Sequence, residues 1–379
     1  MVITAAHFRS QIPRHTLHHV LRFPSHRSLG RIFIRESRFM APLDRIIQDR
    51  DYCQSWSRFG SARGLVQVPV GCDVALFVTQ DGRSDLSPLS RLTSGALQSI
   101  TAYKIDGSQL VHIAGAMALR QLVTGNQGIS NAALKFVSGL TSLEFLALWD
   151  CPVDDRGAAQ LARLRLLRQL HLGQTLVSGK GLLCLEEMFH LETLSLEYTQ
   201  VGEDGLRGIS HLGLRHISLE GCRHIDDLAV THLAGVKTLE KIDARFTQIT
   251  DAGVLYLASL PALRALWLDG PNITDRSLDA ISHLPSLERL DLCAAGITDS
   301  GIRSLTSLPR LQTLWLQRTA ITDRCIDAII SMRTLQKLNI EDTLITSEGR
   351  STIERELPAC TLICSDWKTV RSSSTFSHP

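Results

Sequence analysis

Residues 308–332 read LPRLQTLWLQRTAITDRCIDAIISM, and their apolar side chains follow two different spacings. Leu314 and Leu316 are two residues apart, which places both on one face of a β-strand. Ile326 and Ile329 are three residues apart, which is the spacing of one stripe along a helix. The stretch therefore predicts a short strand followed by a short helix.

The same pattern recurs along most of the chain. The first leucine of each LxxLxL run follows the previous one by 24 residues, with one interval of 23 and one of 25. These leucines are Leu119, Leu143, Leu167, Leu191, Leu214, Leu239, Leu263, Leu287, Leu311 and Leu335. Weaker echoes begin at Val74 and Leu97. One such unit cannot bury its own apolar residues, so stacked units must share a continuous core.

The second half of each unit has its own signature, as in TQITDAGVLYL at 247–257. Thr before Asp, as in Thr298-Asp299, suits a helix start, because oxygens there accept unpaired amide hydrogens and the carboxylate meets the positive end of the helix dipole. The residue after the strand is often Thr and sometimes Cys, and we expect it to bond to backbone across turns and hold the stack together. Pro271 and Ala295 lack a hydroxyl at this position and predict two interruptions.

The unit LxxLxLxxTxITDxGLxxLxxL resembles a leucine-rich repeat, in the variety related to cysteine-containing, F-box-associated and bacterial repeats. The resemblance covers residues 119–357 strongly and residues 74–118, as degenerate repeats, weakly. It implies an α/β solenoid shaped as a horseshoe, with a concave parallel β-sheet and short convex helices. The family implies a binding surface rather than a particular chemistry.

The two ends of the chain differ from the repeats. Residues 1–40 carry seven arginines and one acid, a net charge of +6, which leaves −4 for the rest of a chain whose total is +2. We interpret 1–40 as a basic, disordered extension, either a targeting peptide or a stretch upstream of a true start at Met40. Residues 41–73 are predicted to cap the repeats, and residues 358–379 to form a closing strand and a disordered tail.

The composition is typical of a protein from a reducing compartment. Nine cysteines are scattered without a CxxC pair, whereas an extracellular protein of this kind usually closes its ends with disulfides. The sequence contains no apolar run of about eighteen residues, so we predict no membrane span. We expect a cytoplasmic protein, or an organellar one if residues 1–40 direct it there.

With the leucines pointing inward, the residues between them must form the concave face. Trp267 and Trp315 occupy one position two units apart, about 10 Å from each other, with Asp291 between them. Exposed tryptophan is common in binding hot spots; alternatively, long neighbouring side chains cover both rings as ordinary surface packing. The other candidate residues on this face are Asp243, Arg245, Asp269, Arg289 and Trp149. Trp149 forms a second patch with Phe145 or packs beneath the degenerate repeats.

These observations favour a non-catalytic scaffold that binds a partner polypeptide on its concave face. The sequence has no GxSxG elbow and no GxxxxGK[ST] loop, and we predict no catalytic residue, no metal site and no cofactor. The slightly acidic repeat region argues against nucleic acid, and we expect a monomer that binds protein and no membrane. The alternative implied by the resemblance is a substrate-recognition subunit of a ubiquitin ligase, for which APLDRIIQ at 41–48 is a faint F-box match.

Overall fold

The structure, a computed structural model, describes residues 18–22, 30–36, 57–61, 65–69, 72–78, 85–125 and 127–364. The chain divides into two compact units, unit 1 over Met1–Ser195 and unit 2 over Leu196–Pro379. The F-box-like stretch at 41–48, the start at Met40 and the tail after Cys364 lie outside the described residues, so the predictions made for them stay predictions.

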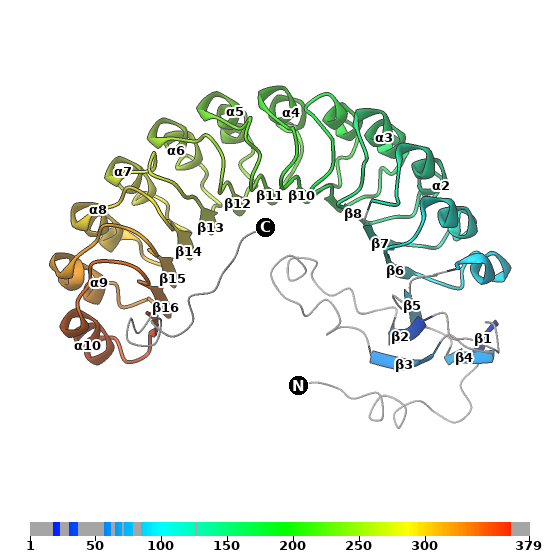
Figure 1. Ribbon diagram of the computed structural model, residues 1–379, viewed down its shortest axis with the longest axis horizontal. Coiled ribbons are helices and arrows are strands. Elements are labelled where there is room, and N and C mark those ends of the chain that lie inside the picture. The colour runs from blue at the N-terminus through cyan, green and yellow to red at the C-terminus, as the bar shows by residue number, and fades with distance from the viewer. Residues whose placement is uncertain are drawn as a thin grey trace, which may run out of the picture. The chain divides into compact units, whose positions relative to one another are not determined.

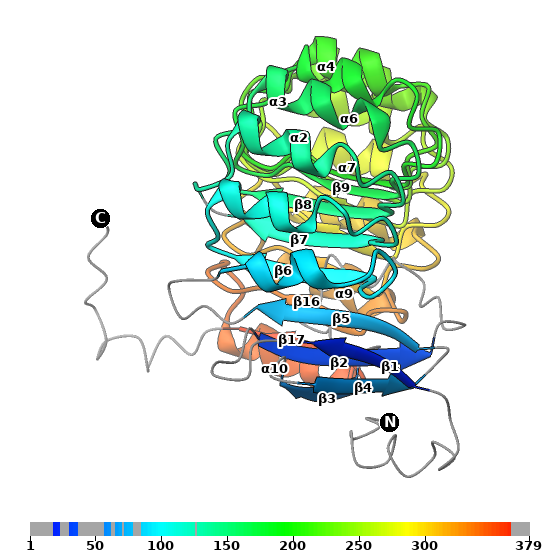
Figure 2. The same ribbon diagram turned by 90° about the vertical axis from the view of Figure 1, so that its right-hand side faces the viewer.

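Unit 1 contains a sheet with the strand order β10-β9-β8-β7-β6-β5-β2-β3 and a separate β1–β4 pair (Figures 1 and 2). Strands β5 to β10 are parallel, while β2 pairs antiparallel with β5 and with β3. Its strands are β1 (His18–Arg22), β2 (Gly30–Glu36), β3 (Ser57–Ser61), β4 (Leu65–Pro69), β5 (Cys72–Val78), β6 (Ser99–Tyr103), β7 (Gln121–Gly125), β8 (Phe145–Trp149), β9 (Gln169–His171) and β10 (Thr193–Ser195). Its helices and 3-10 turns are η3 (Ser87–Arg91), η4 (Gly107–Ile113), η5 (Asn131–Ala133), α2 (Leu134–Val137), α3 (Asp155–Ala159), η6 (Gln160–Arg163) and η7 (Gly181–Leu185).

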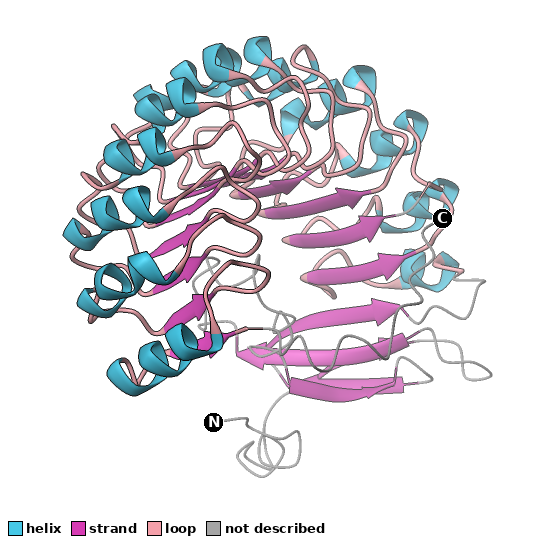
Figure 3. Ribbon diagram, turned by 60° about the vertical axis from the view of Figure 1, so that its left-hand side comes forward, coloured by secondary structure: helices cyan, strands magenta, loops and turns pink. Residues whose placement is uncertain are grey.

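Unit 2 repeats one strand–helix pattern from β11 to β17, and all of its strands are parallel. Its strands are β11 (His216–Ser218), β12 (Lys241–Asp243), β13 (Ala265–Trp267), β14 (Arg289–Asp291), β15 (Thr313–Trp315), β16 (Lys337–Asn339) and β17 (Thr361–Ile363). Its helices and 3-10 turns are α4 (Glu203–Ile209), α5 (Asp227–Thr231), η8 (His232–Gly235), α6 (Asp251–Leu257), α7 (Asp275–Ile281), α8 (Asp299–Ser304), η9 (Leu305–Ser307), η10 (Asp323–Cys325), α9 (Ile326–Ser331) and α10 (Ser347–Glu356). Within each unit the strands form one layer and the helices the other (Figure 3).

The core lies between these two layers and is built by the predicted leucines. Leu290, Leu314 and Leu338 pair directly across β14, β15 and β16, so residues 24 apart in sequence become neighbours in space. Each is at most 1% exposed. The helix predicted from the Ile326 and Ile329 spacing is α9, and both side chains are buried against the strands. The two spacings of the opening stretch thus correspond to the two layers.

A chain of Asp–Thr hydrogen bonds, here called the Asp–Thr ladder, joins successive repeats on the helical side. The Asp that begins a helix accepts the backbone N–H and the hydroxyl of the Thr or Ser that lies 23 residues later. The pairs are Ser178 to Asp155, Thr250 to Asp227, Thr274 to Asp251, Thr298 to Asp275, Thr322 to Asp299 and Thr346 to Asp323. Thr250 and Thr298 also cap their own helices, which confirms the predicted helix starts.

The glycine of the TDxG motif is required by this ladder. A Cβ placed on Gly253 would lie 2.4 Å from Asp227 Oδ1, and one on Gly301 would lie 2.3 Å from Asp275 Oδ1. The space that a side chain would take is filled by the carboxylate of the preceding repeat. Where the position is not glycine, as at Ser277, the residue is small and its hydroxyl donates to the Asp251 carboxylate.

The expected role of the threonines after the strands needs a correction. Thr199 Oγ1 donates to the Leu196 carbonyl at 2.7 Å, and the other threonines of this set bond in the same way three residues back, inside their own repeat. Contacts of this set that cross repeats are made by Cys222, whose Sγ donates to the Leu196 carbonyl at 2.9 Å and lies 3.5 Å from Thr199 Oγ1. The threonine hydroxyl is attached one carbon from the backbone, so it bonds to a carbonyl of its own turn. The contacts that recur between repeats are those of the Asp–Thr ladder.

The amino-terminal region also differs from expectation. The basic stretch predicted to be disordered contains β1 and β2, and β2 pairs with β5 from Gly30 opposite Val78 to Glu36 opposite Cys72. Ile32 in β2 is fully buried. The sequence signal lies in GRIFIRE, where Ile32 and Ile34 are two residues apart, which is the spacing of one face of a strand. The high arginine content concealed this pattern, and the remaining boundaries stay a prediction.

Candidate protein-binding face

The strand register of unit 2 places the predicted residues in one row. Asp243 lies opposite Trp267, Trp267 opposite Asp291, and Asp291 opposite Trp315. All of them point away from the leucine core, because Leu266 and Leu314 alternate with them along the strands and are fully buried. We call this surface, opposite the helices of unit 2, the unit 2 sheet face.

The two indoles of this row flank a buried carboxyl group. Trp315 is 38% exposed and Trp267 is partly exposed, whereas Asp291 between them is only 4% exposed. Asp291 Oδ1 accepts the Cys293 backbone N–H at 3.0 Å. Burial raises the pKa of Asp291 above its usual value and outweighs the hydrogen bonds from Cys293, which act in the opposite direction. The structure therefore brings Trp267, Asp291 and Trp315 together as the sequence predicted.

Arg245 organises the acidic residues at one edge of this face. Its guanidinium donates to both oxygens of Asp243, at 3.0 and 2.6 Å, and to Glu220 Oε2 at 2.8 Å. These hydrogen bonds raise the pKa of Arg245 further, so the group is a permanent cation. Asp269, the next acid along the edge, accepts the Phe246 N–H at 2.6 Å, and burial raises its pKa. The edge is thus a partly neutralised acidic cluster rather than a set of independent charges.

Two exposed aromatic residues beside this cluster were missed by the sequence reasoning. Tyr198 and Phe246 are 48% and 58% exposed. Both have positive φ, at the left-handed position that follows the strand in several repeats. The Tyr198 ring lies over Gly221, where a Cβ would be 2.4 Å from it, and its hydroxyl donates to Glu220 at 2.9 Å. Their signal was the 24-residue spacing itself, read three positions beyond the end of the strand.

Arg289 lies on the opposite side of the same row. Its strand neighbours in register are Ala265 and Thr313, and its side chain is exposed. Lys337, next along after Thr313, is exposed as well. The unit 2 sheet face therefore carries cations where the strands begin, and both indoles where the strands end, in one row with Asp243 of the acidic cluster.

Trp149 is placed in unit 1, at the end of β8. It is 45% exposed, whereas Phe145 at the start of the same strand is 4% exposed. His171 joins the two, with its ring centroid 5.1 Å from that of Phe145 and 6.3 Å from that of Trp149. Burial lowers the pKa of His171 to about 4, so its ring is neutral at pH 7. Trp149 is exposed and not packed away.

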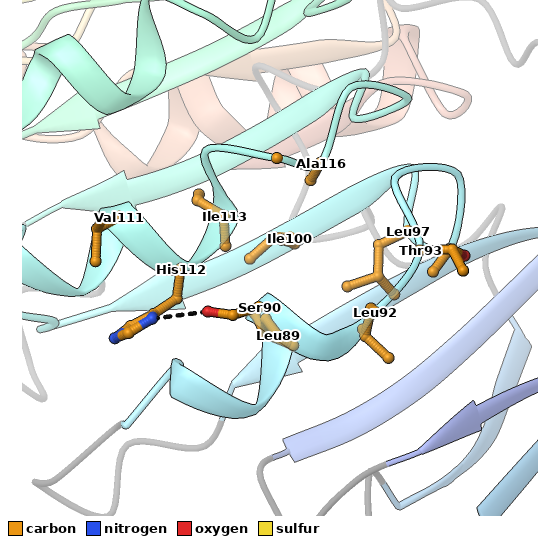
Figure 4. Close-up of a pocket in the computed structure, with 12 residues that line it drawn as sticks. Leu89, Ser90, Leu92, Thr93, Leu97, Ile100, Val111, His112, Ile113 and Ala116 are labelled. Atoms are coloured by element: carbon orange, nitrogen blue, oxygen red, sulfur yellow. Dashed lines mark hydrogen bonds between the residues drawn. The ribbon is translucent and has the colours of Figure 1, made fainter.

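A small cavity of about 160 Å³ lies on the helical side of unit 1, between η3 and η4 (Figure 4). Ser90 Oγ and His112 Nδ1 are 2.8 Å apart at its edge. A nucleophile activated by histidine needs a third group that orients the ring. The lining residues, all within the described part of the chain, include no carboxylate that could do so. We interpret the cavity as incomplete packing between two short 3-10 turns.

The described residues contain no group of three or more His, Cys, Asp or Glu side chains arranged to hold a metal ion. Cys184, Cys222, Cys293, Cys325 and Cys360 are free thiols, and Cys151, Cys222 and Cys325 are buried. None of the described helices is both long and apolar enough to cross a membrane.

Comparison with known proteins identifies the fold. No family model matches the sequence, and no curated protein matches it. An internalin (InlF) from Listeria monocytogenes is 18% identical, with 75% of this chain and 91% of that chain covered and a TM-score of 0.47. An internalin C2 (InlC2) from the same organism is 24% identical, with 55% and 84% covered and a TM-score of 0.44.

The structure of TLR13 in complex with ssRNA13 is 16% identical, with 77% of this chain and 43% of that chain covered and a TM-score of 0.50. TLR13 is a leucine-rich repeat protein, and at this identity the likeness shows the fold alone. The predicted fold class is confirmed: the chain is an α/β leucine-rich repeat solenoid with a parallel sheet and short helices.

Proposed function

We propose that the protein is a non-catalytic interaction scaffold that binds a partner polypeptide on the unit 2 sheet face. One observation carries the proposal. Trp267 and Trp315 lie in a single row around the buried Asp291, in strands whose own leucines are almost completely buried. Indoles at a partly exposed, rigid position supply contact area at little entropic cost, and tryptophan is enriched in binding hot spots.

The charges on this face favour a protein over nucleic acid as the partner. Arg245 is bound by Asp243 and Glu220, so it is neutralised before any ligand arrives. Asp269 and Asp291 add negative charge nearby, which would repel phosphate groups. A polypeptide can instead place apolar groups on the indoles and basic groups on the acidic cluster. The resemblance to the cysteine-containing repeat variety is consistent with this role and belongs to the same proposal.

Affinity purification with mass spectrometry tests the proposal. Wild type is compared with the double variant Trp267→Ala/Trp315→Ala and with Tyr256→Ala, which removes an exposed aromatic residue from helix α6. We expect a partner that wild type and Tyr256→Ala retain and that the double variant loses, by about tenfold or more. A double variant that is folded by circular dichroism and recovers the same proteins as wild type contradicts the proposal.

A further inference from the structure

The sheet face of unit 1 contains buried polar groups without hydrogen-bond partners. Ser99 Oγ, Thr101 Oγ1 and His171 Nε2 make no hydrogen bond, and their residues are only 1%, 5% and 5% exposed. Ser99 and Thr101 alternate along β6 with Ile100 and Ala102, which are fully buried in the core, so both hydroxyl-bearing residues lie on the sheet face. Leaving such groups unpaired costs stability, and binding sites commonly carry this cost.

Two exposed aromatic rings lie next to these groups. Tyr103 is 44% exposed and follows Thr101 by two residues on the same face of β6. Trp149 is 45% exposed, and its ring centroid is 6.3 Å from that of His171. Tyr103 therefore lies beside the Thr101 hydroxyl on β6, and Trp149 on β8 lies beside the His171 ring on β9.

The spacing of the two rings is set by the strands. Tyr103 lies opposite Gly125, and Gly125 lies opposite Trp149. The rings are thus two strand spacings apart, about 9.6 Å, and glycine places no side chain between them. A polyproline II helix rises about 3.1 Å per residue with three residues per turn, so it repeats every 9.3 Å or so. Such a helix lying across the strands would meet one ring at each turn.

The polar groups on this face also suit a proline-rich segment. Proline has no N–H, and a polyproline II helix makes no internal hydrogen bonds, so its carbonyls remain in need of donors. The Thr101 and Ser99 hydroxyls and the Trp149 indole N–H are donors, and the neutral His171 ring donates through Nε2 in one of its two tautomers. The face offers neutral donors to a ligand that consists of neutral acceptors.

The arginines beside this face are ion-paired, which argues against a nucleic-acid ligand. Arg120 forms an ion pair with Glu144, and Arg168 pairs with Glu192 in the next repeat. Between the two aromatic rings lies the buried Gly125, and Val123 and Ala147 lie in the row beside it; none of the three is charged. A phosphate backbone needs free cations along its path, whereas a neutral polypeptide does not.

We propose that the sheet face of unit 1 binds a proline-rich polypeptide segment in the polyproline II conformation. The segment lies across β6, β7 and β8, stacks on Tyr103 and Trp149, and accepts hydrogen bonds from Thr101 and His171. This site consists of unit 1 residues alone and does not depend on the function proposed for unit 2.

Titration calorimetry with the full chain tests the proposal, using decaproline and a glycine–serine decapeptide of the same length. We expect decaproline to bind and the flexible peptide not to bind. Trp149→Ala and Tyr103→Ala should each weaken decaproline binding about tenfold, the usual effect of removing a hot-spot ring. Tyr256→Ala on α6 is the matched control and should bind like wild type.

A second variant separates binding from folding. Thr101→Val keeps the shape of the side chain and removes the unpartnered hydroxyl, so it should raise the melting temperature while weakening decaproline binding about fivefold. Three results would each overturn the proposal. The first is that wild type does not bind decaproline. The second is that Trp149→Ala or Thr101→Val binds decaproline as tightly as wild type does. The third is that wild type binds cellohexaose instead of decaproline, which would assign the rings to sugars.

Discussion

The two sides of each repeat in unit 2 differ in what they repeat. On the helical side, Asp251 and Asp275 make the same bonds to the next repeat. On the sheet side, the corresponding row changes from residue to residue, and its members are Asp243, Trp267, Asp291, Trp315 and Asn339. Stacking requires the same groups at every step, whereas recognition requires different ones. The contrast separates the residues that hold the scaffold from those that we propose to bind a partner.

The largest expected effect comes from neighbouring residues on opposite faces of β13. Leu266→Ala removes a fully buried side chain and should lower the free energy of unfolding by about 2–5 kcal/mol, because the stacked repeats cannot collapse around the cavity. Trp267→Ala removes a larger side chain from the sheet face and should cost less than about 1 kcal/mol. Urea denaturation followed by circular dichroism measures both.

This pair decides between the two interpretations of the indoles. If Trp267→Ala costs as much as Leu266→Ala, the ring is part of the packing, and the protein-binding role assigned to it loses its basis. A small cost leaves the ring available for a partner.

The Asp–Thr ladder should give the next largest effect. Asp251→Ala leaves the Thr274 N–H, the Thr274 hydroxyl and the fully buried Ser277 hydroxyl without their acceptor. We expect a loss of about 1–3 kcal/mol in the free energy of unfolding. Asp327→Ala, in the first turn of α9, removes an exposed carboxylate and should stay within about 0.5 kcal/mol. Equal effects of the two substitutions would show that the ladder contributes nothing beyond ordinary helix capping.

The fold was predictable because its determinants are local and periodic. The LxxLxL spacing predicts strands that bury Leu290, Leu314 and Leu338, and the register confirms it. The Thr-Asp pairs predict helix starts, but the main partner of each Asp lies 23 residues away, a contact that exists only once the repeats are stacked. Sequence spacing alone does not reveal it.

The candidate site was only partly predictable for a similar reason. The row of Trp267, Asp291 and Trp315 follows from strand alternation and needs no further information. The exposure of Tyr198 and Phe246 depends on a left-handed residue after the strand, which has no residue-type signal when the residue is not glycine. Burial of Asp291 likewise depends on how the neighbouring side chains are arranged.

The smallest expected effect is the most specific test, because the pKa of an aspartate is lowered on the helical side of a repeat and raised on the sheet side. Burial alone would raise the pKa of Asp251, but hydrogen bonds from Ser277 and Thr274 outweigh it and lower the pKa below its usual value. Its contribution to stability is therefore present at neutral pH and is lost as the pH falls through the lowered pKa. Burial raises the pKa of Asp291, so ionisation of that group costs stability as the pH rises.

Conservative amide variants make this difference measurable. At pH 7, Asp251→Asn should be less stable than wild type and Asp291→Asn should be more stable. Each change in the free energy of unfolding should be smaller than the change caused by Asp251→Ala. The Asp291→Asn difference should shrink towards about pH 3, where wild-type Asp291 is protonated, and the Asp251→Asn difference should shrink as the pH falls through the lowered pKa of Asp251. Urea denaturation at the two pH values measures them, and carboxyl carbon chemical shifts report the two titrations directly. If both variants shift stability in the same direction at pH 7, the two carboxylates do not lie in the different environments that separate the scaffold side from the binding side.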